Sequence, residues 1–458
     1  MIPEKAKAGI EELTREELIA LVYELLGRLN EVEEKLRLKQ TPTTSKNSSQ
    51  PPARDIKGEK KKRKLSRKKG AKAGHEKHER ALVDEPSKVN EVYVDNCSNC
   101  HLNLLDQVPV RTVRRQITEL PEIKPVVIET RQHEVICPCC GERQVGQLPE
   151  GLEAGRYFGP RLETLVTILH HEHHIGFERL VQICGEVFQL SLSEGGAVAM
   201  VQRAGQAVYG AAKAIWEQVR QSAILGSDET SARVNGQNYW HWVFVGGQGE
   251  YHLIVPSRGY DVIESFMGEC EADVWVSDCW KAQLNAPARL YQICLAHQIR
   301  NLQGLIDRRP QLRWAKEMQA LFRQAIRLGN RREHMTERGY QRQVLLLHRH
   351  LERLLKHRFR GLGTNLLERY RKYRDSLFVF LQRSDVPADN NACERALRPS
   401  VIHRKVMGSF RSEWGAQAYA ALTTVLNTAK RHGESTFQKL ASLMGTPILP
   451  FLDQPIFA

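Results

Sequence analysis

The apolar pattern changes at residue 223, and this change restricts the possible folds more than any other feature. Residues 156–222 have the spacing of helices, whereas SAILGSDETSARV alternates with a period of two. Asn235-Gly236 then predicts a type I′ turn into NYWHWVFVG, and a second turn at GGQGE leads into YHLIVPS. A helix (DVIESFMG) and two more strands (DVWVSD and YQICLAH) follow. The sequence therefore predicts an α/β core that begins with three antiparallel strands.

Three acidic residues occupy distinct places in this core. Asp228 lies within the first strand, Asp278 ends the strand DVWVSD, and Glu394 lies on a helix in DNNACERALRP. This order resembles the ribonuclease H-like fold, in which one carboxylate sits in strand one and another at the tip of strand four. Carboxylate oxygens suit Mg²⁺ or Mn²⁺, and two such ions stabilise the attacking and leaving oxygens of an in-line phosphoryl displacement. We therefore expect a two-metal site, with Glu229 on the opposite face of the strand and not catalytic.

A basic, helical stretch separates the second carboxylate from the third. Residues 298–385 read as an insertion, and folding can reunite the two ends of such an insertion at one edge of the core. We expect the core to comprise residues 223–297 and the final helices at 386–435, with a C-terminal tail at 436–458.

The net charge is +14 with a pI of about 9.3, which indicates a polyanionic partner. Residues 54–80 hold thirteen Lys or Arg against four Asp or Glu, a net charge of +9. They belong to a linker, residues 39–85, that we expect to be disordered and to contact DNA phosphates through Lys61, Lys62, Arg63 and Lys64. No apolar run has the length of a membrane span and the first residues are charged, so we expect a cytoplasmic, nucleic-acid-associated protein.

Two CxxC pairs predict a zinc ribbon within residues 86–150. Cys97 and Cys100 form the first pair, and Cys137 and Cys140 form the second. The strand-like segments TVRRQITEL and KPVVIETRQHEVI lie between them. Four thiolates around one Zn²⁺ leave no open coordination position, so the predicted zinc is structural.

The N-terminal part carries two more predicted modules. Residues 1–38 contain a leucine-rich helix whose apolar residues are spaced as in a short coiled coil, which favours self-association over docking on the same chain. Residues 151–222 form a helical module that could be a helix-turn-helix for DNA. Its four histidines at 170, 171, 173 and 174 lack HExxH spacing, so we expect a polar or phosphate-facing helix edge and no metal site there.

The chain resembles the insertion sequence 66 family of DDE transposases along nearly its whole length. The resemblance is carried by the leucine-rich start, NSSQPP, CPCCG, DET, SD, CLAHQIRN and DNNACERALRPSVIHRK. The segment CLAHQIRN departs from the family at Leu295 and Gln298. The predicted fold class is thus α+β and multidomain: a ribonuclease H-like α/β core with a helical insertion, preceded by a helical module, a zinc ribbon and a coiled-coil-like helix.

The resemblance implies an enzyme that cleaves DNA at the ends of an element and joins the released 3′-hydroxyl to target DNA. The catalytic triad maps to Asp228, Asp278 and Glu394, with two Mg²⁺ or Mn²⁺ ions. The expected partners are terminal-repeat and target DNA, a second copy of the chain, and accessory proteins of the same element. The alternatives are a transposase-derived DNA-binding protein that does not cut and a nuclease without strand transfer. Residues that could contact DNA near the site are Arg395, Arg398, Arg404, Lys405 and His297.

Overall fold

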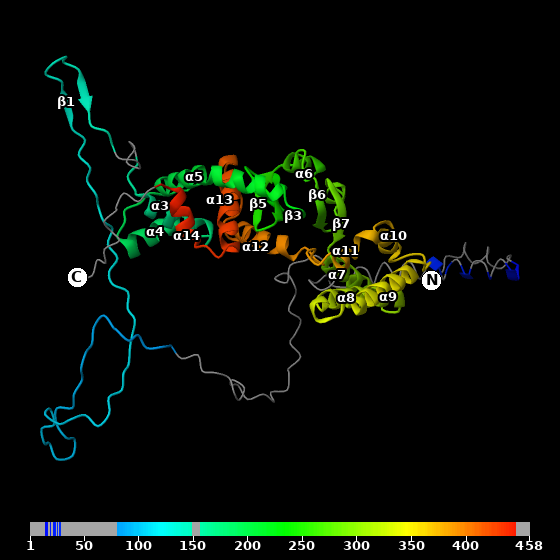
Figure 1. Ribbon diagram of the computed structural model, residues 1–458, viewed down its shortest axis with the longest axis horizontal. Helices are drawn as coiled ribbons and strands as arrows, with labels where there is room; N and C mark the ends of the chain where they lie inside the picture. Colours follow the sequence, from blue (N-terminus) through cyan, green and yellow to red (C-terminus); the bar gives the residue numbers. More distant parts are fainter. Residues whose placement is uncertain are drawn as a thin grey trace, which may run out of the picture. The chain divides into compact units, whose positions relative to one another are not determined.

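The computed structural model describes residues 80–148 and 156–445, together with scattered positions between 14 and 28 (Figure 1). Contacts divide the described residues into two units. The smaller holds residues 80–127 and 187–189, and the larger holds residues 128–186, 190–445 and the described N-terminal positions. Residues Lys61, Lys62, Arg63 and Lys64 lie outside the described residues.

The first helical segment is described only in part. Its described positions from 15 to 28 are helical, as predicted. Val22 and Leu25 of the expected coiled-coil seam are about half exposed, at 52% and 53%. The other seam positions, Leu18, Leu29, Val32 and Leu36, lie outside the described residues. The coiled coil therefore stays a prediction.

The central sheet of the larger unit has five strands in the order β5-β4-β3-β6-β7. Strand β3 pairs antiparallel with β4, and β4 antiparallel with β5, whereas β6 and β7 run parallel to β3. Asn235 and Gly236 both have positive φ, as the predicted hairpin turn requires. The strands are β3 (Ile224–Val234), β4 (Gln237–Gly246), β5 (Gly249–Val255), β6 (Ala272–Ser277) and β7 (Ala288–Ile293). The predicted mixed α/β core is confirmed.

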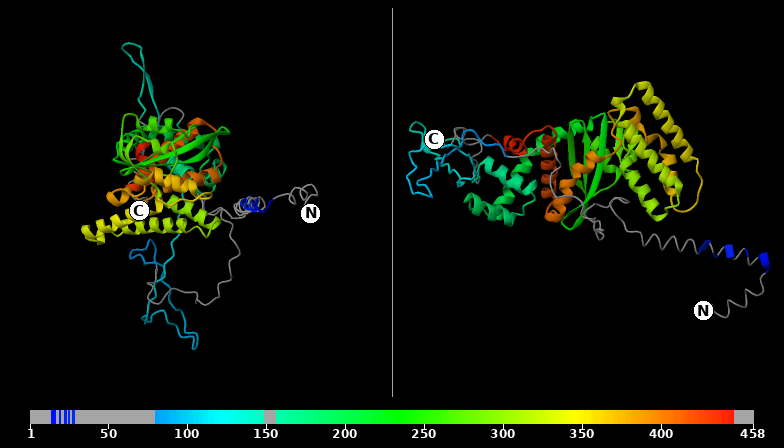
Figure 2. Two further views of the ribbon diagram at one scale, coloured as in Figure 1. Left: turned by 90° about the vertical axis from the view of Figure 1, so that its right-hand side faces the viewer. Right: turned by 90° about the horizontal axis from the view of Figure 1, so that it is seen from below.

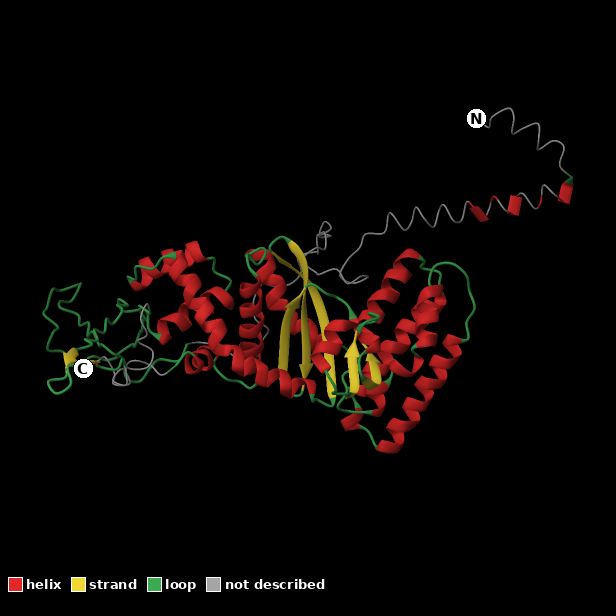
Figure 3. Cartoon of the chain, turned by 90° about the horizontal axis from the view of Figure 1, so that it is seen from above, coloured by secondary structure: helices red, strands yellow, loops and turns green. Residues whose placement is uncertain are grey.

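Helices cover both faces of this sheet, as Figure 3 shows. On one face, Trp242, Phe244 and Trp275 pack against α6 (Tyr260–Met267) and the end of α5 (Glu194–Arg220). On the other, Val243 and Val245 pack against α12 (Asn391–Val406), and the same face of the sheet also contacts α13 (Glu413–Arg431). Side chains alternate between these faces because β-strands have a period of two.

Residues 160–220 form α3 (Pro160–His171), α4 (Phe177–Phe188) and α5, as the helical spacing predicted. The expected polar edge is wrong for two of its histidines. His171 is 7% exposed and packs against Tyr419 of α13, and His170 stacks on Phe177. Burial lowers the pKa of both imidazoles. Helical spacing alone did not reveal that α13 covers this face.

Part of the expected C-terminal tail is a helix. Helix α14 (Thr436–Leu443) begins at Ser435, whose side chain accepts a hydrogen bond from the Gln438 amide. Its Leu440 is fully buried and belongs to the core that α3, α5 and α13 share. Residues 446–458 lie outside the described part of the chain.

The region expected to be an insertion, residues 298–385, is helical and shares a core with the sheet, but its first helix begins three residues earlier, at Leu295. Its helices are α7 (Leu295–Arg308), α8 (Arg313–Gly329), α9 (Glu337–Leu355), α10 (Thr364–Lys372) and α11 (Val379–Gln382). Val274 and Val276 of β6 belong to the same apolar cluster as Phe322, and the two views in Figure 2 show these helices, in yellow, beside the sheet. At β7, the side chain of Gln292 accepts from the Phe380 amide and donates to the Leu377 carbonyl. The insertion is therefore anchored to the β7 edge.

The two ends of the insertion meet at the start of α7. The Leu295 amide donates to the Ala388 carbonyl at 3.0 Å, and the Asn390 amide donates to Cys294 Sγ at 3.2 Å. The expectation that folding reunites these ends is confirmed. No helix among the described residues is long and apolar enough to cross a membrane.

Candidate active site

The three predicted carboxylates come from neighbouring elements. Asp228 lies in β3, Asp278 directly follows β6, and Glu394 lies in the first turn of α12. Gly226 of β3 pairs with Val276 of β6, so the two aspartates follow this pair by the same number of residues. Helix α12 packs across β3 on the face that carries Val243, the residue paired with Asp228.

The carboxylates interact electrostatically. Burial raises the pKa of Asp228 well above its usual value, and the nearby carboxylates Glu229, Asp278 and Glu394 raise it further. Like charges held together in a partly buried place destabilise one another unless a cation or a proton compensates them. An all-oxygen donor set of this kind fits a hard divalent cation such as Mg²⁺ or Mn²⁺.

The oxygens of Asp228, Asp278 and Glu394 do not all lie within 4.8 Å of one another. One oxygen of Glu394 accepts from Arg300 at 3.0 Å and lies 3.5 Å from His297 Nδ1. Among the described residues, the group whose possible ligand atoms all lie within 4.8 Å of one another is Cys294, His297 and Glu394. The structure thus places Asp228 and Asp278 on the neighbouring strands β3 and β6, and contacts from α7 hold Glu394 at the start of α12.

Cys294 is a poor metal ligand in this group. Burial raises the pKa of its thiol to about 12, whereas metals bind the thiolate. Its sulfur already accepts from the Asn390 amide and lies 3.3 Å from His297 Nδ1. Cys294 therefore fastens the start of α7 to the start of α12, and His297 lies next to Glu394, where the sequence placed it near the site.

Asp278 is held by the loop that follows it. Its carboxylate accepts from the Trp280 amide at 2.7 Å, and the Trp280 indole donates to the Arg258 carbonyl at 3.3 Å. The Arg258 guanidinium lies between two rings, 3.9 Å from the centroid of Trp280 and 4.5 Å from that of Trp240. Asp278 is thus indirectly connected to a stacked arginine.

Glu229 completes this support. Its side chain, 2% exposed, pairs with Arg258 at 2.7 Å and accepts from Gln283. These partners come from the loop after β5 and from η2 (Gln283–Asn285). Sequence reasoning treated Glu229 as non-catalytic but missed that it anchors the arginine behind Asp278. The alternation of side chains along β3 indicated that Glu229 faces away from Asp228, but this alternation could not identify Arg258 as the partner of Glu229.

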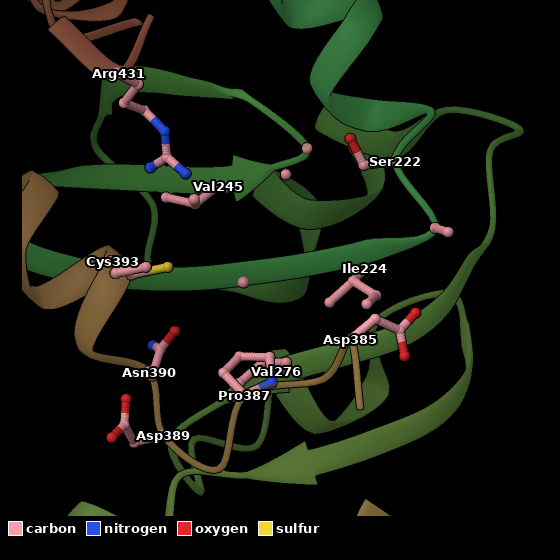
Figure 4. Close-up of a pocket in the computed structure, with 15 residues that line it drawn as sticks. Ser222, Ile224, Val245, Val276, Asp385, Pro387, Asp389, Asn390, Cys393 and Arg431 are labelled. Atoms are coloured by element: carbon pink, nitrogen blue, oxygen red, sulfur yellow. The ribbon is translucent and has the colours of Figure 1, made fainter. Parts of the chain in front are cut away.

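Close packing brings α12 onto β3. A Cβ atom at Gly226 would lie 2.9 Å from Cys393 Sγ and 3.1 Å from Asn390 Oδ1. The Asn390 side-chain amide donates to the Ser227 carbonyl at 2.7 Å. Figure 4 shows Asn390 and Cys393 at the wall of a cavity of about 560 Å³ on this face of the sheet. Asp389 also lines the cavity, but the three carboxylates do not.

The basic residues after Glu394 have different environments. Arg395, Arg398 and Lys405 are exposed on α12. Arg404 donates to the side chain and carbonyl of Ser231 in β3, so its guanidinium is held against the sheet. Pro399 lies inside α12 without ending the helix.

The cysteine pairs form two similar turns. In each, the amide of the first cysteine donates to the carbonyl five residues on, and the residue after the second cysteine has positive φ. These residues are His101 and Gly141. Hydrogen bonds from backbone amides within the turn lower the pKa of Cys97 and Cys137, which favours the thiolates that zinc requires.

The strands of this region differ from the prediction. Only β1 (Glu134–Ile136) and β2 (Arg143–Val145) form, and they pair around the second cysteine turn. Residues 112–120, read as a strand, have no regular secondary structure. Many of their apolar side chains are exposed, so local alternation found no packing partner here. The two cysteine pairs belong to different units, and the four-thiolate site stays a prediction.

Replacing Arg258 by Leu should destabilise the fold by about 3 kcal/mol, because Glu229 would be left buried without its cation. The double variant Glu229→Gln/Arg258→Leu should lose less, since no unpaired carboxylate remains. Chemical unfolding of both proteins measures the difference. Equal losses would show that the ion pair does not support this loop.

Replacing Gly226 by Ala should destabilise the protein by about 1–3 kcal/mol, because the new methyl group overlaps Cys393 and Asn390. Gly210→Ala on α5 is the matched control, since nothing lies within 4 Å of its Cβ position. The control should be as stable as the wild type or more so. Thermal unfolding compares the three proteins, and an unchanged Gly226→Ala would contradict the close packing.

Comparison with known proteins places most of the larger unit in a family. The sequence model described as "Transposase IS66 family" matches residues 155–418, more than half of the chain, and a family of unknown function (DUF6444) matches residues 2–81. An uncharacterized protein, y4jO, of Sinorhizobium fredii is 34% identical over 80 residues, which are 18% of this chain and 25% of that protein. The chain thus spans about a quarter of the length of this relative. From the family match over its sheet, insertion and α12, the chain belongs to the IS66 family of transposases.

Proposed function

We propose that the chain is a DDE transposase that cleaves DNA at the ends of an element and joins the ends to target DNA. The observation that carries this proposal is the placement of three carboxylates on adjoining elements: Asp228 within β3, Asp278 directly after the neighbouring parallel strand β6, and Glu394 in the first turn of α12, which packs on β3. The strand order β5-β4-β3-β6-β7, with three antiparallel strands and two parallel additions, supports a ribonuclease H-like core. One aspartate in its central strand and one after the neighbouring parallel strand are placed as that fold would require.

The three carboxylates would hold two Mg²⁺ or Mn²⁺ ions. Their carboxylate oxygens would be the protein ligands of these ions. Bound ions would supply Lewis acidity, activating a water or 3′-hydroxyl and stabilising the charge of the leaving oxygen. The chain's own contribution is to position these groups: Trp280 orients Asp278, and Arg300 and His297 orient Glu394.

DNA would reach this site across α12. Arg395, Arg398 and Lys405 are exposed and close in sequence to Glu394, so they are candidates for phosphate contacts beside the scissile bond. Arg404 has a different proposed role, because its guanidinium fastens the later part of α12 to β3. The helical module at 151–222 and the cysteine-containing region would bind element ends, with one structural Zn²⁺ in the latter. A dimer and accessory proteins of the element belong to the same proposal.

The deciding experiment combines the purified protein, Mg²⁺ or Mn²⁺, a labelled terminal repeat of its element and a target plasmid. Wild type should give a covalently joined product, and Asp228→Asn should lose at least a thousandfold in rate while still binding DNA. Asp375→Asn is the matched control, because this exposed carboxylate pairs only with neighbouring Arg374 among the described residues.

Each alternative has its own result. Cleavage without joining would favour a nuclease that lacks strand transfer, or a missing accessory protein. Specific binding with neither reaction would favour a transposase-derived DNA-binding protein. Full activity of Asp228→Asn would contradict the proposed site.

The proposed zinc can be tested separately. Cys137→Ser should reduce the bound zinc from about one ion per chain to nearly none, because three thiolates bind the ion much more weakly than four. Elemental analysis of the purified protein measures this. Cys139→Ser is the control, since Cys139 lies in the same turn but is not a proposed ligand. Equal zinc in wild type and Cys137→Ser would contradict the assignment.

A further inference from the structure

The positive charge of the chain is concentrated in two segments. Residues 298–385 hold twenty-one Lys or Arg against eight Asp or Glu, a net charge of +13, and residues 54–80 hold +9. Since the whole chain carries a net charge of +14, the residues outside these two segments carry a net charge of −8. The insertion is therefore the main source of positive charge among the folded parts of the chain. Packing against the sheet does not by itself require this excess of charge.

The insertion places its cations on the side of its helices that faces solvent. In α9, Tyr340, Val344, Leu347, Leu351 and Leu354 are buried in the shared core. Arg338, Arg342, Arg349 and Arg353 are exposed, and their helical spacing puts them opposite that buried face. In α8, exposed Arg313, Lys316, Arg323 and Arg327 form a second stripe of the same kind. We call these eight residues the two basic stripes.

The two basic stripes lack internal compensation. Among the residues that the structure describes, none of the eight cations has a carboxylate within ion-pair distance; the pairs formed by other arginines of the insertion involve Arg300, Arg374 and Arg383. Arg338 and Arg342 lie four residues apart, as do Arg349 and Arg353, so like charges are neighbours on the helix surface. Such repulsion is relieved when a polyanion binds.

The α9 stripe is long enough to follow about two thirds of one turn of duplex DNA. Arg338 and Arg353 are separated by about 22 Å along the helix, against about 34 Å for one turn of the duplex. Arginine recognises phosphate through bidentate hydrogen bonds. The insertion also adjoins the carboxylates, since α7 carries Arg300 at Glu394 and continues directly into α8.

We propose that the two basic stripes bind the phosphate backbone of duplex DNA that continues beyond the scissile bond. The proposal deepens the proposed function, because the identity of this DNA rests on cleavage at Asp228, Asp278 and Glu394. The contact is sequence-blind, since it recognises phosphates. It would hold flanking or target DNA while α12 contacts the bond to be cut.

The test replaces Arg338, Arg342, Arg349 and Arg353 together by Gln in the full chain. Binding to a random-sequence 40-base-pair duplex is measured by fluorescence anisotropy over a series of salt concentrations. Affinity at low salt should fall at least tenfold, and the slope of log K against log salt should become shallower by about 3. A second variant, Arg313→Gln/Lys316→Gln/Arg323→Gln/Arg327→Gln, should act in the same direction and gives an independent reading if the first fails to fold.

The matched control removes the same charge from exposed positions outside the insertion, the helical module 151–222 and α12: Arg233, Arg289, Arg411 and Lys430. If the control lowers the salt slope as much as the stripe variants, the effect is general electrostatics and the proposal is wrong. The proposal is also wrong if both stripe variants keep the wild-type salt slope on duplex DNA. The same anisotropy measurement on single-stranded RNA adds one more check: variants that bind RNA less tightly but duplex DNA as tightly as the wild type would contradict it.

Cleavage separates this proposal from the proposed function. On a short substrate that ends a few base pairs from the cut, the stripe variants should cleave like wild type, and they should fall behind as flanking duplex is added. Loss of cleavage that is equal for short and long substrates would contradict a role in flank binding. If the wild type cleaves no substrate but the stripe variants still reduce the salt slope, the two basic stripes are supported as a DNA-binding surface. The proposed transposase function is then contradicted.

Discussion

The packing of α12 on β3 is the contact on which the arrangement of the carboxylates depends. Glu394 is distant in sequence from Asp228, and only this helix brings it to the sheet. The approach is close because Gly226 has no side chain where Cys393 and Asn390 lie. Asn390 then donates to the carbonyl of Ser227, the residue next to Asp228. Affinity for metal and DNA would thus depend on a contact made entirely by groups that touch neither.

A second set of contacts acts from the opposite face of the sheet. Glu229 and Asp228 are consecutive, so their side chains point to opposite faces and have different hydrogen-bond partners, although each carboxylate still feels the charge of Asp278. Asp228 meets other carboxylates, whereas Glu229 meets Arg258 and the two tryptophans that enclose it. Of these two adjacent residues, Asp228 lies in a site where a bound cation would compensate the negative charge. Glu229 is already compensated by the guanidinium of Arg258. This separation explains how several acidic groups can lie close together in a stable fold.

Local pattern predicted much of the fold and of the candidate site. Strand periodicity placed Asp228 within a strand and Asp278 at the end of a buried strand, and Glu394 was expected on a helix, although Pro399 interrupts the helical spacing. The cysteine turns also follow from local sequence. What failed depended on distant partners: the strand expected at 112–120 did not form, and His171 is buried under Tyr419. The roles of Arg404 and Glu229 were hidden for the same reason, because a charged side chain does not reveal its partner.

The closed base of the insertion has an evolutionary consequence. Its two ends are joined by the Leu295–Ala388 and Cys294–Asn390 hydrogen bonds, so the path between them can change without moving the carboxylates. The connection between α8 and α9, remote from that base in sequence, is where related chains could lengthen, shorten or recharge this subdomain. The arrangement of the three carboxylates and the charge of this subdomain could then change independently of one another.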